Sequence, residues 1–200
     1  RDWSSDVCSS DLVNNKMRIV WLVLLLVPSL LVEAHTGVVG VGGFLFGVIH
    51  PFTGPDHLLM LILVGIWATQ QKSRALAIAI PLTFIVVMAL SATALFLFTT
   101  TPLFGVEGAI LLSLLLGSGV VMSRKVLTTA IALPISALFA AVHGAAHGLE
   151  AALLFVSPLS FLSGMTLSAL VLIMVGVAVG RMVQGRGVAP QRLRKIHWGE

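Results

Sequence analysis

Residues 50–57 read HPFTGPDH, and they interrupt an apolar stretch that would otherwise be long enough to cross a bilayer. Apolar segments flank the interruption at residues 36–50 and 55–70. A single continuous helix is excluded because Pro51 and Pro55 each lack a backbone donor and clash with the preceding turn. Non-helical backbone is tolerated at membrane depth only where protein or a water-filled cavity surrounds it. The sequence therefore predicts a first helix that is broken or re-entrant, beside a cavity.

The composition of the chain is that of a membrane protein. It is 58% hydrophobic and 10% charged, with a mean hydropathy of +1.05, whereas about 25% of the residues of a soluble domain are charged. We predict an all-α, polytopic transmembrane helix bundle with about five to six spans after a cleavable signal peptide, and the lipid bilayer as a partner. The remaining apolar segments are residues 75–98, 103–122, 126–155 and 160–182, of which 126–155 is expected to be broken.

The N-terminal region divides into two parts of different character. Residues 1–16 are polar and aperiodic, and we interpret them as a non-native extension, with an ordinary disordered tail as the alternative. Residues 17–34 have the charged start, short apolar region and small-residue site of a secretory signal peptide. Cleavage after Ala34 would make His35 the mature N-terminus. An uncleaved signal anchor is the rival interpretation, which Pro28 and the short apolar region disfavour.

The basic residues predict the orientation of the bundle. They cluster at residues 72–74, 124–125 and 181–195, and all three clusters fall on one side if the four later segments alternate in direction. Loops rich in Lys and Arg face the cytoplasm. We therefore expect the mature N-terminus outside and residues 183–200 as a basic cytoplasmic tail. The formal net charge of +4 is no sign of a nucleic-acid partner, because these residues occupy short loops and the tail.

Ionisable side chains recur in a second apolar segment, at His143, His147 and Glu150. Such side chains are costly in hydrocarbon and mark functional sites by default. His143 and His147 are four residues apart and share a helix face, a spacing that lets two imidazoles bind one ion. No glutamate follows His143, so this is not a zinc-protease motif. Gly144 and Gly148 form a ridge of small residues that lets another helix approach closely.

The two clusters are expected to lie at similar depth in the outer half of the membrane. At the rise of a helix, His57 is about 22 Å from Lys72 and His143 about 27 Å from Lys125, within a hydrocarbon core about 30 Å thick. Imidazole and carboxylate without a thiol is a ligand set for a divalent metal such as nickel, cobalt or zinc. The predicted metal ligands are His50, Asp56, His57, His143, His147 and Glu150. The alternative is that the histidines are buried donors to backbone carbonyls.

These motifs resemble those of the HupE/UreJ family of membrane nickel/cobalt transporters. The resemblance rests on residues 34–37 (AHTG), on the motif at 50–57, and on residues 143–150 (HGAAHGLE). It implies that residues 35–182 form a metal-transport domain in the bacterial inner membrane. Nickel is the first expectation and cobalt the second, as cargo rather than as a prosthetic cofactor, with a link to hydrogenase or urease maturation. The sequence leaves open whether the protein forms a homo-oligomer.

His35 is a seventh predicted metal ligand. After signal cleavage its free α-amine and its imidazole could chelate a divalent ion and pass it to Asp56 and His57. The amine binds only when unprotonated, so capture should strengthen as the external pH rises toward its ordinary pKa of about 7.7–8.0. The alternative is that His35 is merely the residue that processing leaves.

Other functions are less well supported by the sequence. An intramembrane metal-dependent hydrolase would need a polarised water and a general base, for which Glu150 is the candidate. The chain lacks both a nucleotide-binding motif and a rhomboid-type serine motif, so we expect a transporter and no enzyme. A metal sensor or chaperone is disfavoured because the chain has no soluble output domain. Five methionines are interpreted as lipid- and core-filling side chains: Met60, Met88, Met122, Met165 and Met174.

Overall fold

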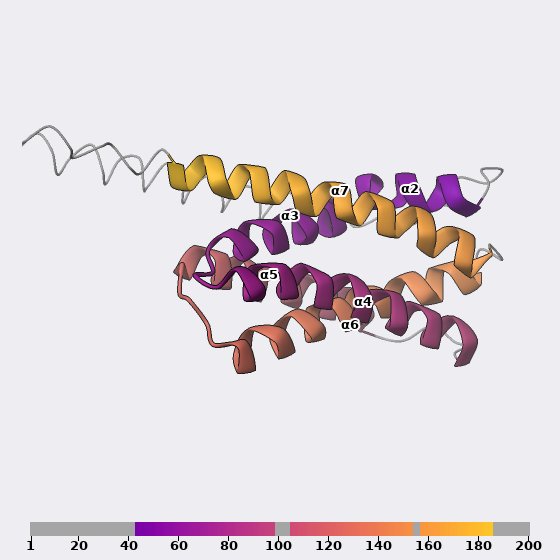
Figure 1. The fold of residues 1–200 in the computed structure, drawn as a ribbon. Coiled ribbons are helices and arrows are strands. Elements are labelled where there is room, and N and C mark those ends of the chain that lie inside the picture. Colours follow the sequence, from indigo (N-terminus) through magenta and orange to yellow (C-terminus); the bar gives the residue numbers. More distant parts are fainter. Residues whose placement is uncertain (1–42, 99–104, 154–156, 186–200) are drawn as a thin grey trace, which may run out of the picture.

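The structure, a computed structural model, describes residues 43–98, 105–153 and 157–185, and every regular element in these ranges is a helix (Figure 1). The predicted all-α class is thus confirmed. The non-native extension, the signal peptide, His35 and most of the tail lie outside the described residues. The helices are α2 (Gly43–Thr53), α3 (Pro55–Thr69), α4 (Arg74–Phe98), α5 (Val106–Ser123), α6 (Thr129–Leu153) and α7 (Pro158–Gly185).

The first span is broken, as predicted. Helices α2 and α3 meet at an angle of 80° across a one-residue break, whereas α4, α5, α6 and α7 are each long and apolar enough to cross a membrane. Counting the bent pair as one span gives five spans in the described part of the chain, at the lower end of the predicted number.

The break follows from the local sequence at residues 50–57. Gly54 has an extended backbone (φ −96°, ψ 106°) and precedes the first turn of α3, where Pro55 is accommodated without loss of a hydrogen bond. The Thr53 hydroxyl donates to the His50 carbonyl at 2.9 Å, and the Gly54 N–H donates to the same oxygen at 3.3 Å. The last turn of α2 is therefore closed by its own residues, and His50 and His57 come to lie on either side of the bend.

The predicted break within residues 126–155 is wrong. Helix α6 is continuous from Thr129 to Leu153 and contains Pro134. A methyl group added at Gly144 would overlap the Met88 carbonyl of α4, and one added at Gly148 would overlap the Ala92 carbonyl. The glycines thus permit close packing of α6 on α4, and this packing supports the helix, since tertiary contacts outweigh intrinsic propensity.

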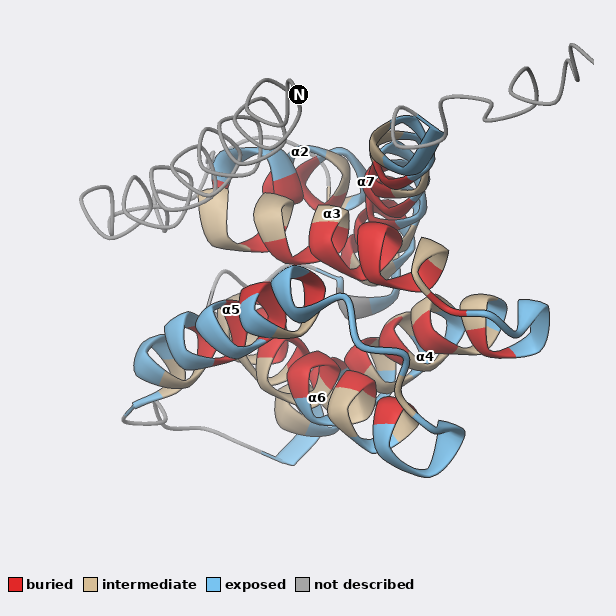
Figure 2. Cartoon of the chain, turned by 90° about the vertical axis from the view of Figure 1, so that its left-hand side faces the viewer, coloured by how far each residue is buried: buried red, intermediate tan, exposed pale blue. Residues whose placement is uncertain are grey.

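The helices form two layers, α2, α3 and α7 in one and α4, α5 and α6 in the other (Figures 1 and 2). Within the first layer, methyl groups added at Gly47 or Gly65 of α2 and α3 would overlap backbone atoms of α7. The seam between α4 and α6 is built in the same way. Between the layers, in contrast, a methyl group added at Gly117 of α5 would make only an ordinary contact, at 3.4 Å, with the flexible end of Met60 of α3. The closest backbone contacts around glycines therefore lie within the layers.

One end of the bundle gathers the basic residues. The Gln70 amide donates to the Val121 carbonyl at 2.9 Å, and the Gln184 amide donates to the Thr69 carbonyl at 3.1 Å. These bonds join the C-terminal ends of α3, α5 and α7, next to the first residues of α4. The described basic residues all lie at or near this end, as predicted: Lys72, Arg74, Arg124, Lys125 and Arg181.

Candidate metal centre

Three buried imidazoles meet where the bend between α2 and α3 faces α6. His50 lies in the last turn of α2, His57 in the first turn of α3, and His147 on α6. One nitrogen from each ring lies within 4.8 Å of the others, and each residue is at most 3% exposed. The ring centroids are 4.4 Å apart for His57 and His147, and 4.9 Å apart for His50 and His147. We call these residues the three-histidine site.

The spacing of these nitrogens suits a single first-row metal ion. Histidine binds such ions at about 2.0–2.1 Å, so two nitrogens on one ion are at most about 4.2 Å apart. The observed limit of 4.8 Å leaves only small side-chain movements to complete the contacts. Three imidazoles around one point therefore fit a single cation, and three nitrogens leave coordination positions for oxygen ligands.

Two carboxylates stand at the edge of the three-histidine site. Glu150 Oε2 lies 3.3 Å from His50 Nε2, and Asp56 Oδ2 lies 3.8 Å from His57 Nε2. Their side chains are 12% and 22% exposed, more than the imidazoles. Asp56 is also the acid in the first turn of α3, where it opposes the positive end of the helix dipole. In their ionised form the two carboxylates together balance the charge of a divalent cation.

His143 lies one turn of α6 away from His147 and outside the three-histidine site. Its Nδ1 lies 2.9 Å from the Phe139 carbonyl oxygen. A carbonyl only accepts, so Nδ1 carries the proton and the lone pair of the neutral ring is on Nε2. The buried Nε2 has no hydrogen-bond partner in the part of the chain that is described. A histidine oriented in this way by a backbone carbonyl is pre-organised as a ligand.

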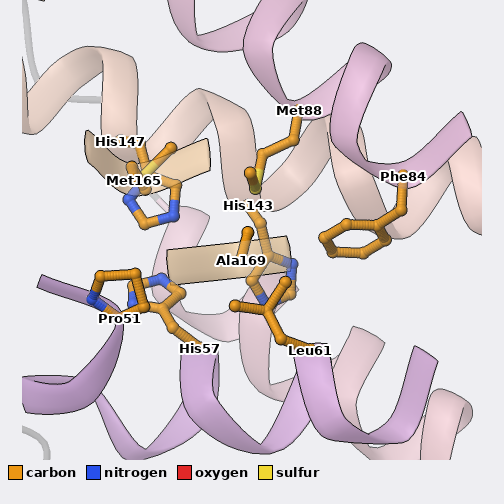
Figure 3. Close-up of a pocket in the computed structure, with 9 residues that line it drawn as sticks. All are labelled: Pro51, His57, Leu61, Phe84, Met88, His143, His147, Met165 and Ala169. Atoms are coloured by element: carbon orange, nitrogen blue, oxygen red, sulfur yellow. The ribbon is translucent and has the colours of Figure 1, made fainter. Parts of the chain in front are cut away.

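A small cavity extends from the three-histidine site (Figure 3). Two of its residues, Met88 and Met165, are site residues that the sequence alone does not reveal. Thioethers in apolar spans carry neither charge nor a distinctive spacing, so no sequence signal separates them from core-filling residues. The lining consists of Pro51, His57, Leu61, Phe84, Met88, His143, His147, Met165 and Ala169.

The chain also matches a known protein family. A family model described as HupE / UreJ protein matches residues 22–196. The chain belongs to the HupE/UreJ family. HupE/UreJ proteins are membrane proteins of a transporter family associated with nickel and cobalt transport. No curated protein and no solved structure matches the chain.

The structure brings together most of the residues predicted as ligands. The two sequence clusters, which lie far apart in the chain, meet through His50 and His57 on one side and His147 on the other. Asp56 and Glu150 lie beside them, His143 lies one turn farther along the cavity, and His35 lies outside the described residues. Whether these residues bind metal remains a prediction of the HupE/UreJ assignment and of the site's chemistry.

Proposed function

We propose that this HupE/UreJ protein takes up a divalent transition metal, nickel first and cobalt second, across the bacterial inner membrane. The observation that carries the proposal is the three-histidine site, with two carboxylates beside it, buried within a bundle of apolar helices. Imidazole and carboxylate ligands suit both ions and do not separate them by affinity alone. Geometry and metal supply then decide which ion is carried.

The exposure of the side chains gives an order of contacts for the ion. Asp56 and Glu150 are partly exposed, whereas the imidazoles of the three-histidine site are buried. An ion that arrives at the end opposite to the basic residues meets the carboxylates first. It then exchanges water for imidazole nitrogens at the bend between α2 and α3. Broken helices at an ion site are a recurrent feature of transporters.

The two layers supply a mechanism for opening the site. His50 and His57 belong to the first layer, and His147 and Glu150 belong to the second. Movement of one layer against the other would change the distances between these ligands, while the tight glycine contacts within each layer persist. For a divalent ion the membrane potential supplies about 4.6 kcal/mol per 100 mV, twice the value for one charge. This is an adequate driving force for inward movement.

Radiotracer uptake tests the function directly. Cells that lack their own nickel and cobalt uptake systems should accumulate ⁶³Ni, and to a lesser extent ⁵⁷Co, when they produce this protein. An uncoupler should reduce the accumulation, because it collapses the potential that drives the cation. Uptake equal to that of cells with an empty vector, with the protein present in the membrane, would refute the proposal.

The position of the basic residues yields a prediction about topology. Because they gather at one end, a reporter fused after residue 185 is expected to lie in the cytoplasm. A fluorescent-protein fusion should therefore be bright, and an alkaline phosphatase fusion should be inactive. Active phosphatase at this fusion would reverse the orientation and, with it, the side from which the ion arrives.

A further inference from the structure

The cavity lies one helical turn beyond the three-histidine site, toward the basic end of the bundle. Along α3, which runs toward that end, Leu61 follows His57 by one turn. Along α6, which runs away from that end, His143 precedes His147 by one turn. Phe84 and Leu61 line the cavity on the basic side and are followed by apolar core. The cavity is thus a position that adjoins the three-histidine site and extends one turn beyond it.

This position shares His57 and His147 with the three-histidine site and adds thioether sulfurs, which that site lacks. Met88 and Met165 line the cavity and are 2% and 1% exposed. Figure 3 shows their sulfur-bearing ends directed toward the rings of His143 and His147, from opposite layers of the bundle. His143 adds an Nε2 without a hydrogen-bond partner among the described residues. Both carboxylates are absent from the residues that line the cavity.

We propose that Met88, Met165 and His143 form a second cation site, which selects soft monovalent ions such as Cu(I) and Ag(I). Thioethers prefer soft ions, and hard or borderline divalent ions favour the nitrogen and oxygen donors next door. The absence of a carboxylate from the cavity lining also favours a single positive charge over two.

In the transport cycle the same position has a second role, which rests on the proposed function. A divalent ion that leaves the three-histidine site would be held only weakly by thioethers. Passage requires sites that bind strongly enough to admit an ion and weakly enough to release it. The affinity of this second site for a soft monovalent ion, in contrast, does not depend on whether the protein transports nickel.

Silver binding to the purified full-length protein tests the site. Ag(I) is the probe, in chloride-free buffer and detergent. All samples carry Cys8→Ser, so that the only cysteine of the sequence cannot bind silver in molecules that retain the N-terminal residues. Replacing both Met88 and Met165 with leucine is expected to weaken Ag(I) binding at least about tenfold, the lower value typical for losing a supporting group around a metal. The matched control is Met60→Leu, a buried methionine that does not line the cavity.

Methyl NMR on the Cys8→Ser protein gives a second readout that needs no destabilising change in the cavity. With ¹³C-methyl methionine, the signals of Met88 and Met165 should shift on adding Ag(I), while that of Met60 should stay. Unshifted signals, or unchanged silver affinity in the folded double leucine variant, would overturn the proposal. Because neither experiment measures uptake, silver binding without nickel uptake would refute the proposed function and leave this site intact.

Discussion

Replacing His57 with alanine is expected to lower nickel uptake at limiting metal by about a hundredfold or more. Loss of a group that merely orients a metal ligand costs about 10- to 100-fold, and His57 is itself a proposed ligand. Its ring lies 4.4 Å from that of His147, 5.3 Å from that of His50 and 5.5 Å from that of His143. No other imidazole of the cluster has so many imidazole neighbours. Initial rates of ⁶³Ni uptake, normalised to protein in the membrane, measure the effect.

His50→Ala and His147→Ala are expected to act in the same direction, since each removes one nitrogen of the three-histidine site. The matched control is Ser136→Ala on α6. Ser136 is fully buried and its hydroxyl donates to the Ile80 carbonyl at 2.8 Å, away from the site. Its loss should cost about 1 kcal/mol of stability and leave uptake within about twofold. Normal uptake by all three histidine variants would exclude the metal-site hypothesis.

The largest effect on stability is expected for Gly148→Ala. A methyl group here would overlap the backbone carbonyl of Ala92, which cannot move aside without displacing α4. Overpacking of this kind costs about 1–3 kcal/mol. Because His147 and Glu150 lie on the same stretch of α6, the displacement would also disturb the ligands. We expect a lower unfolding temperature in detergent and reduced nickel uptake.

The matched control is Gly119→Ala on α5, where the added methyl group meets no atom within 4 Å. The same substitution there should leave the unfolding temperature unchanged or raise it slightly, since alanine is the better helix former. Equal unfolding temperatures for the two variants would show that the contact between α6 and α4 tolerates the methyl group. The close approach of α4 and α6 would then not be needed to position the ligands of the three-histidine site.

The sequence by itself determined several features of this protein. Apolar segments of sufficient length required spanning helices, because hydrocarbon leaves backbone groups no other partners. The two prolines predicted a break, which the structure places at Gly54 before Pro55, whereas Pro51 is accommodated inside α2. The ionisable residues in apolar segments identified both clusters, since such residues are costly in lipid unless they serve a function. Each of these conclusions depends on local chemistry, which a sequence carries directly.

The tertiary structure decided which of these residues share a site. The i, i+4 spacing of His143 and His147 predicted one shared ion, yet only His147 joins His50 and His57, and His143 faces the neighbouring cavity. Nor could the sequence assign Met88 and Met165 to that cavity, or show that α6 is continuous. Periodicity fixes which residues share a helix face, whereas the rotation and contact of that face depend on how α4, α6 and α7 pack. Such contacts join residues far apart in the chain, and no local pattern encodes them.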